Sequence, residues 1–126
     1  MSLIDDSKQR ADLLFQQGRE KYKQERFQTA AEDFLESMAL FKQLGNRLGE
    51  ASSLYNLGLI RHIQGDCRQR SEFVQAVEDY KEANKFFEAA LQIYREIGNR
   101  QMEANSLYRL GLVCASRNKY QLATDY

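Results

Sequence analysis

The phrase LGNRLGEASSLYNLG at Leu44–Gly58 recurs as IGNRQMEANSLYRLG at Ile97–Gly111, and ten of the fifteen positions are identical. A weaker copy precedes both, in which Ala11, Leu14, Phe15 and Gly18 match Ala51, Leu54, Tyr55 and Gly58. The glycine that ends the phrase recurs after 40 residues and then after 53. A phrase repeated at such spacings is typical of stacked structural units, each built from one supersecondary element.

The composition favours an all-helical domain. Proline is absent, and Glu, Gln, Lys, Arg, Ala and Leu, which are good helix formers, dominate the 126 residues. Eighteen basic and eighteen acidic residues cancel, so the charge favours neither nucleic acid nor a membrane surface as a partner. The first residues show no secretory signal. We therefore expect a cytoplasmic protein in which Cys67 and Cys114 are reduced thiols.

Each copy reads as two helices. In the first copy, apolar residues at helical spacing predict a second helix from about Gln28 to Leu44. Gly45 should end this helix, since glycine takes the left-handed conformation without a Cβ clash. Asn46 is suited to cap the next helix. Gly98 and Asn99 repeat this stop-and-restart signal.

Small and aromatic residues at fixed offsets identify the unit. The second copy has Leu54, Leu57-Gly58 and then Ala83 and Phe87, and an aromatic residue stands three positions before the alanine of every copy. These aromatic residues are Phe27, Tyr80 and Tyr120. The pattern resembles the tetratricopeptide repeat, and most closely its subclass of about 40 residues per repeat. The motif's tryptophan is replaced by leucine in all three copies.

This resemblance implies an α-solenoid of antiparallel helix pairs that binds proteins and is not an enzyme. We expect one domain over 1–126, with repeats at about 11–45, 51–98 and 104–126. The third repeat is truncated, because Tyr126 falls inside its expected second helix.

The second repeat is longer than the first by thirteen residues. Gly58 and Ala83 are twenty-five residues apart, whereas Gly18 and Ala30 are twelve apart, and the excess corresponds to residues 67–79. Aromatic residues recur every seven positions through this insertion, at Phe73, Tyr80, Phe87 and Tyr94. The spacing predicts one long helix from about Arg70 to Ile97.

Two features favour self-association. The start of the long helix presents Phe73, Val74 and Val77, which either pack on their own chain or form a surface for a second chain. The first helix of the third repeat carries Leu107 and Leu110 and lacks a complete second helix to cover it. A homodimer is therefore an alternative to a monomeric adaptor.

Nothing in the sequence indicates catalysis or a cofactor. His62 is the single histidine, so neither a histidine pair for a metal nor an ordinary catalytic triad is expected. We expect it at the edge of a groove or in solvent. The many carboxylates stand beside Lys and Arg at helical spacing, as on a solvated helix face.

The function should therefore lie in a surface that binds a protein or peptide. The resemblance implies a concave groove lined by the first helix of each repeat, with an aromatic row at Phe15, Tyr55 and Tyr108. The same face carries Arg19, Tyr22, Asn56, Leu59, His62, Asn105 and Arg109. Alternatively, the aromatic residues pack between adjacent repeats.

Some members of the family bind the C-terminal carboxylate of chaperone tails through Lys, Asn and Arg. Asn56 and Arg109 match that pattern, but Phe15, Arg19 and Asn105 occupy its other positions. Two matches of five do not favour binding of this kind.

Overall fold

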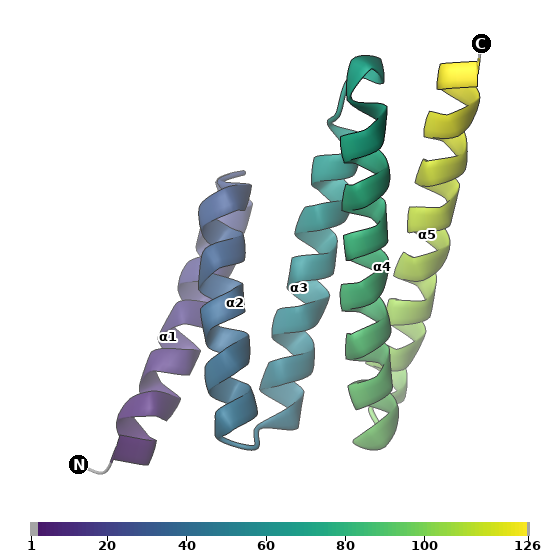
Figure 1. Cartoon of the computed structure of the whole chain (residues 1–126). Helices are drawn as coiled ribbons and strands as arrows, with labels where there is room; N and C mark the ends of the chain where they lie inside the picture. Colours follow the sequence, from purple (N-terminus) through teal and green to yellow (C-terminus); the bar gives the residue numbers. More distant parts are fainter. Residues whose placement is uncertain (1–2, 126) are drawn as a thin grey trace.

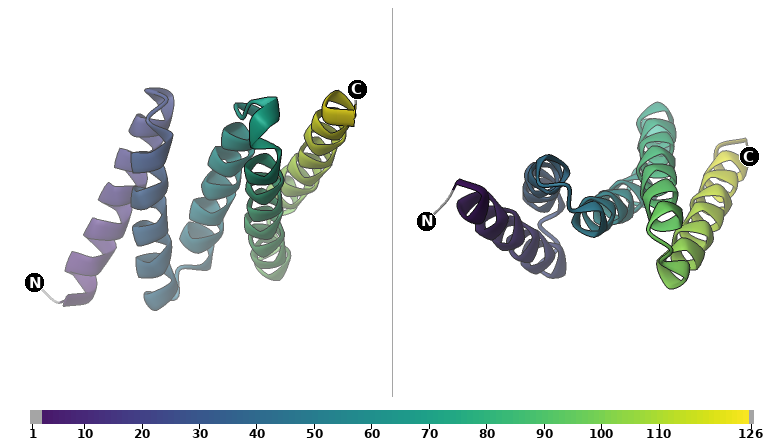
Figure 2. Two further views of the ribbon diagram at one scale, coloured as in Figure 1. Left: turned by 45° about the horizontal axis from the view of Figure 1, so that its top comes forward. Right: turned by 90° about the horizontal axis from the view of Figure 1, so that it is seen from below.

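The protein is a row of helices in which each packs against the next (Figures 1 and 2). A computed structural model describes residues 3–125, and side-chain environments within residues 6–122. The elements are α1 (Leu3–Lys23), α2 (Phe27–Gln43), α3 (Arg47–Asp66), the 3₁₀ turn η1 (Arg70–Glu72), α4 (Phe73–Glu96) and α5 (Arg100–Asp125). No strand occurs within residues 3–125. The predicted all-α solenoid of antiparallel pairs is confirmed.

The stop-and-restart signals behave as predicted. Gly45 and Gly98 have φ of 71° and 75°, in the left-handed region that glycine favours. The N–H of Gly45 bonds to the carbonyl of Lys42, which satisfies one of the free carbonyls at the end of α2. At the start of α3 the Asn46 side chain accepts a hydrogen bond of 2.9 Å from the N–H of Gly49.

Glycines let aromatic rings sit directly against the backbone of the first helices. A Cβ on Gly18 would lie 2.9 Å from the Phe34 ring, and a Cβ on Gly58 would lie 2.7 Å from the Phe87 ring. Both rings are fully buried. The glycine of the repeat phrase and the aromatic residue of the second helix therefore form the same packing unit in both repeats, although more residues separate them in the second repeat.

The insertion lengthens both helices of the second repeat as well as the turn between them. Helix α1 ends five residues after Gly18, whereas α3 ends eight residues after Gly58. Helix α2 begins seven residues before Phe34, whereas α4 begins fourteen residues before Phe87. The predicted long helix is present as α4, and η1 takes up its first predicted residues.

Added length in both helices creates a second glycine–aromatic contact. A Cβ on Gly65 would lie 2.7 Å from the ring of Tyr80. This pair lies seven residues beyond Gly58 on α3 and seven residues before Phe87 on α4. The insertion thus repeats the existing packing two helical turns further on.

The expectation that the chain ends inside a second helix of the third repeat is wrong, because α5 is unbroken from Arg100 to Asp125. In the first repeat the corresponding turn is made by Glu25, with φ of 61°. The matching position in the third copy is Asn118, and α5 continues through it. The continuing helix keeps the backbone hydrogen bonds that a turn would interrupt. Ala123 lies beyond the described side chains, and Tyr126 beyond the described residues.

The continuation of α5 covers part of the insertion. The rings of Phe73 and Tyr120 lie 5.8 Å apart, and the Tyr120 hydroxyl donates a hydrogen bond to the carbonyl of Gln69. Val77 is half-buried, whereas Val74 is 68% exposed. The structure thus places Phe73 against its own chain and leaves Val74 as the exposed member of the predicted patch.

Candidate functional site

A hollow of about 340 Å³ lies on the side of the row formed by the first helices. Helices α1, α3 and α5 all contribute to it, together with the end of α4. The lining residues are Phe15, Arg19, Ser52, Tyr55, Asn56, Tyr94 and Met102. Four of the predicted groove residues, Phe15, Arg19, Tyr55 and Asn56, therefore meet in one hollow.

The two aromatic side chains of the hollow are fixed by the second helices behind them. Phe15 meets the Phe34 ring edge to face at 5.6 Å, and Tyr55 meets the Phe87 ring in the same way at 5.5 Å. Both side chains are half-buried. Phe15 and Tyr55 therefore pack on the second helix of their own repeat and also line the hollow.

Hydrogen bonds hold the polar side chains around the hollow in place. Arg109 Nε donates to the Tyr55 hydroxyl at 3.0 Å, and the hydroxyls of Ser52 and Tyr94 are 3.3 Å apart. Asn56 Nδ2 donates to the carbonyl of Ser52 at 2.8 Å. Burial raises the pKa of Tyr94, which keeps this hydroxyl protonated.

Two arginines lie at the hollow or next to it: Arg19 lines it, and Arg109 bonds to the hydroxyl of the lining residue Tyr55. Neither Arg19 nor Arg109 forms an ion pair with a carboxylate among the described residues. Arg19 is exposed, and Arg109 is half-buried with its bond to a neutral hydroxyl. Two guanidinium groups therefore remain available to a carboxylate from outside the chain.

His62 connects α3 to α5 outside the hollow. Its Nε2 lies 2.8 Å from Ser116 Oγ and 3.4 Å from Asp66 Oδ2. Burial lowers the pKa of His62, and Asp66 only partly opposes this shift. In a serine–histidine–aspartate triad the carboxylate holds the other ring nitrogen, so this geometry is that of a buried structural contact.

The remaining predicted groove residues lie outside the hollow. Tyr22 packs edge to face on Phe27, and Leu59 packs on the core beneath α4. Asn105 Nδ2 contacts the Met102 sulfur at 3.3 Å, and Tyr108 is 65% exposed on α5.

Sequence reasoning missed Tyr94 and Met102 as lining residues. Tyr94 comes from a second helix, and the prediction was restricted to first helices. Tyr94 stands seven residues after Phe87, so it lies on the same face of α4 and packs against Ala51 of α3. This spacing was the signal in the sequence that could have identified Tyr94.

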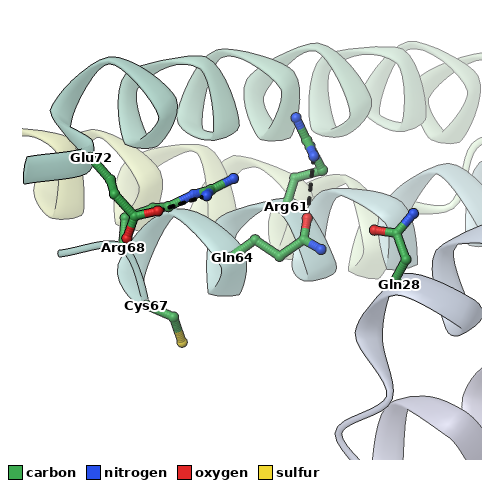
Figure 3. A pocket seen from close by; sticks show the side chains of 6 residues that line it. All are labelled: Gln28, Arg61, Gln64, Cys67, Arg68 and Glu72. Atoms are coloured by element: carbon green, nitrogen blue, oxygen red, sulfur yellow. Dashed lines mark hydrogen bonds and ion pairs between the residues drawn. The ribbon is translucent and has the colours of Figure 1, made fainter.

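A separate hollow of about 360 Å³ lies where α3 meets the insertion, and Figure 3 shows its side chains. Arg61 and Arg68 line it, and both bind the buried carboxylate of Asp79, at 3.1 and 2.9 Å. Arg68 also pairs with Glu72 at 3.1 Å, so each arginine already has an acidic partner. We assign this cluster to the stability of the α3–α4 pair.

Neither a metal site nor a membrane span occurs in the part of the chain that the structure describes. No group of three His, Cys, Asp or Glu side chains there could hold a metal ion. None of its helices is both long and apolar enough to cross a membrane.

Comparison with known proteins agrees with the architecture. Residues 68–126 match the family model described as Tetratricopeptide repeat, and no curated protein matches the chain. The matched segment contains α4 and α5, and the glycine–aromatic packing of α3 and α4 is repeated by α1 and α2 outside it. Residues 68–126 therefore carry a tetratricopeptide repeat.

Proposed function

We propose that this chain is an adaptor that holds a segment of a partner protein in the hollow between its first helices. Tetratricopeptide repeats are in general protein–protein interaction modules. One observation carries the proposal: Phe15, Arg19 and Tyr55 line one hollow, and Arg109 bonds to the Tyr55 hydroxyl beside it, with neither guanidinium group in an ion pair among the described residues. Fixed aromatic surface supplies contact area, and the guanidinium groups supply directional donors.

The preferred segment carries a carboxylate beside an aromatic or aliphatic side chain. A carboxylate would bridge Arg19 and Arg109, while the apolar side chain would contact Phe15, Tyr55 and Met102. The Asn56 amide already bonds to its own helix, which argues against the carboxylate clamp used for chaperone tails.

Selection of peptides from a random display library on the immobilised chain tests the proposal. Selected peptides should be rich in Asp or Glu next to an apolar residue. The double variant Arg19→Ala, Arg109→Ala should weaken their binding about tenfold or more, since each guanidinium loses a charge-assisted hydrogen bond. Arg117→Ala removes an exposed arginine of α5 outside the hollow and should change nothing. Equal affinity of the double variant and the control for the selected peptides would refute peptide binding in the hollow.

Self-association is the second candidate, and it is favoured by the exposure of large apolar side chains. Leu107 is 46% exposed and Val74 is 68% exposed, while Leu110 and Val77 are half-buried beside them. Sedimentation equilibrium over a wide concentration range should then show a dimer that Leu107→Lys or Val74→Lys weakens. A strict monomer at the highest concentration would exclude this candidate.

A further inference from the structure

A smaller hollow, of about 230 Å³, continues the groove on the other side of Phe15. It lies between α1 and α3, at the end where α2 turns into α3. Phe15 and Ser52 line both this hollow and the larger one described above, so the two hollows share a wall. The other lining residues are Asp12, Phe41, Asn46, Leu48 and Gly49. We call this space the Leu48 hollow.

The floor of the Leu48 hollow is aromatic and fixed in place. Phe41 is buried and meets the Phe15 ring edge to face at 6.3 Å. Gly49 lets the Phe41 ring lie directly against the backbone of α3, because a Cβ on Gly49 would be 2.5 Å from that ring. Leu48 stands beside this floor and is 52% exposed. The Leu48 hollow therefore offers contact area to an apolar side chain from outside the described residues.

The two hollows carry opposite charges. Asp12 lines the Leu48 hollow and Arg19 lines the larger hollow, and both side chains are exposed. Neither forms an ion pair within the described part of the chain. They are seven residues apart on α1, which is two helical turns or about 10 Å. Helices α1 and α3 run in the same direction (Figure 1), so the lining residues of α3 follow the same order along the groove.

We infer that the groove takes a segment with a basic residue at one end, an acidic residue at the other and two apolar side chains between them. This inference rests on the proposed function and adds the basic residue and a second apolar side chain to the segment described there. The basic side chain pairs with Asp12, and the neighbouring apolar side chain fills the Leu48 hollow. The other apolar side chain and the carboxylate occupy the larger hollow beside Arg19.

The spacing of the two hollows fits an extended segment of about five residues. Alternate side chains of an extended chain lie on the same side, about 7 Å apart, so two of them enter the hollows on either side of Phe15. The two charged residues flank this pair, and their flexible side chains reach the ends of the groove. The expected pattern is therefore basic, apolar, any residue, apolar, acidic, in either chain direction.

Parallel selections from a random peptide display library on three immobilised chains test the inference. The unaltered chain should select the full pattern. Asp12→Lys should select an acidic residue in place of the basic one, while the apolar pair and the other acidic residue are kept. Glu32→Lys is the matched control, because Glu32 is an exposed acid of α2 that lines neither hollow. It should select the same peptides as the unaltered chain.

Affinities of one selected peptide then test each contact separately. Replacing its basic residue by Glu should weaken binding to the unaltered chain about fivefold, and Asp12→Lys should restore the binding of this altered peptide. Leu48→Ala should weaken binding of the original peptide about fivefold, because an apolar contact is lost. Leu13→Ala removes an exposed leucine of α1 outside both hollows and should leave the affinity unchanged.

Failure of this inference is distinguishable from failure of the proposed function. Peptides that lose affinity for the Arg19→Ala, Arg109→Ala variant, but carry no basic residue and bind Leu48→Ala as tightly as the unaltered chain, would overturn the inference alone. Peptides that bind the double variant as tightly as the unaltered chain would overturn both. A dimer of the unaltered chain that Asp12→Lys makes monomeric in sedimentation equilibrium would also overturn the inference, because a second copy would then occupy the Leu48 hollow.

Discussion

At the scale of single residues, glycines in the same place of the repeat have opposite roles. Gly58→Ala should lower the free energy of unfolding by about 1–3 kcal/mol, because its Cβ would lie 2.7 Å from a ring with no room to move. Gly111→Ala should raise it by up to about 1 kcal/mol, since alanine favours the helix and nothing lies nearby. Urea unfolding of both variants measures the difference, and equal effects would contradict the packing described.

His62 should make the stability depend on pH. Burial lowers its pKa in the folded chain below 6.5, with Arg109 acting in the same direction and Asp66 against it. Between the lowered pKa and 6.5 the unfolded chain binds the proton more readily, so stability is complete above this window and falls as pH decreases through it. His62→Gln should remove this part of the pH dependence.

Denaturant unfolding is compared at about pH 7.5, above the ordinary pKa of histidine, and at about pH 5.5, below it. The loss of stability on acidification should be smaller in His62→Gln than in the unaltered chain. An identical loss in both would show that His62 does not titrate differently on folding.

At the scale of elements, the lengthened α3–α4 pair depends on the buried Asp79. Its carboxylate is 2% exposed and is shared by Arg61 and Arg68, each about one-third exposed. Asp79→Ala should cost about 2 kcal/mol, less than breaking a fully buried pair because water reaches both guanidinium groups. Glu72→Ala, which removes an exposed pair and a turn contact, should cost clearly less than Asp79→Ala. Equal losses would contradict this assignment.

The sequence predicts a helix or a turn correctly where a single local signal determines where the helix ends or how long it is. Gly45 and Gly98 fix the turns between repeats, and the seven-residue spacing from Phe73 to Tyr94 fixes the long helix. How the insertion is divided between α3, the turn and α4 was not predictable from spacing alone. That division depends on Gly65 meeting Tyr80, a contact between residues of different helices.

The course of α5 depends on tertiary packing in the same way. Asn118 stands where Glu25 makes the first turn, and its type suits a turn. In the structure α5 continues through Asn118, and Tyr120 packs on Phe73 and Tyr80 in the continuous helix. Packing thus overrides the local preference here.

At the scale of the whole molecule, stacking joins residues distant in sequence into one candidate site. The repeat spacing predicts that Phe15, Tyr55 and Asn56 share a face, and the structure brings them together. It does not predict that Tyr108 stays outside the hollow, where it is 65% exposed and has no ring contact among the described residues like that of Tyr55 with Phe87. The repeat spacing also does not predict the hydrogen bond from Arg109 to Tyr55, because this bond depends on how α3 and α5 are placed relative to each other.

The most direct test maps a bound peptide onto the chain by NMR. A library-selected acidic peptide is added to the ¹⁵N-labelled protein, and amide shifts are followed through the titration. Binding in the hollow predicts that the largest shifts cluster at Arg19, Ser52, Tyr55, Asn56 and Met102. Largest shifts on the outer residues of α2 and α4, with those five amides unmoved, would contradict the account.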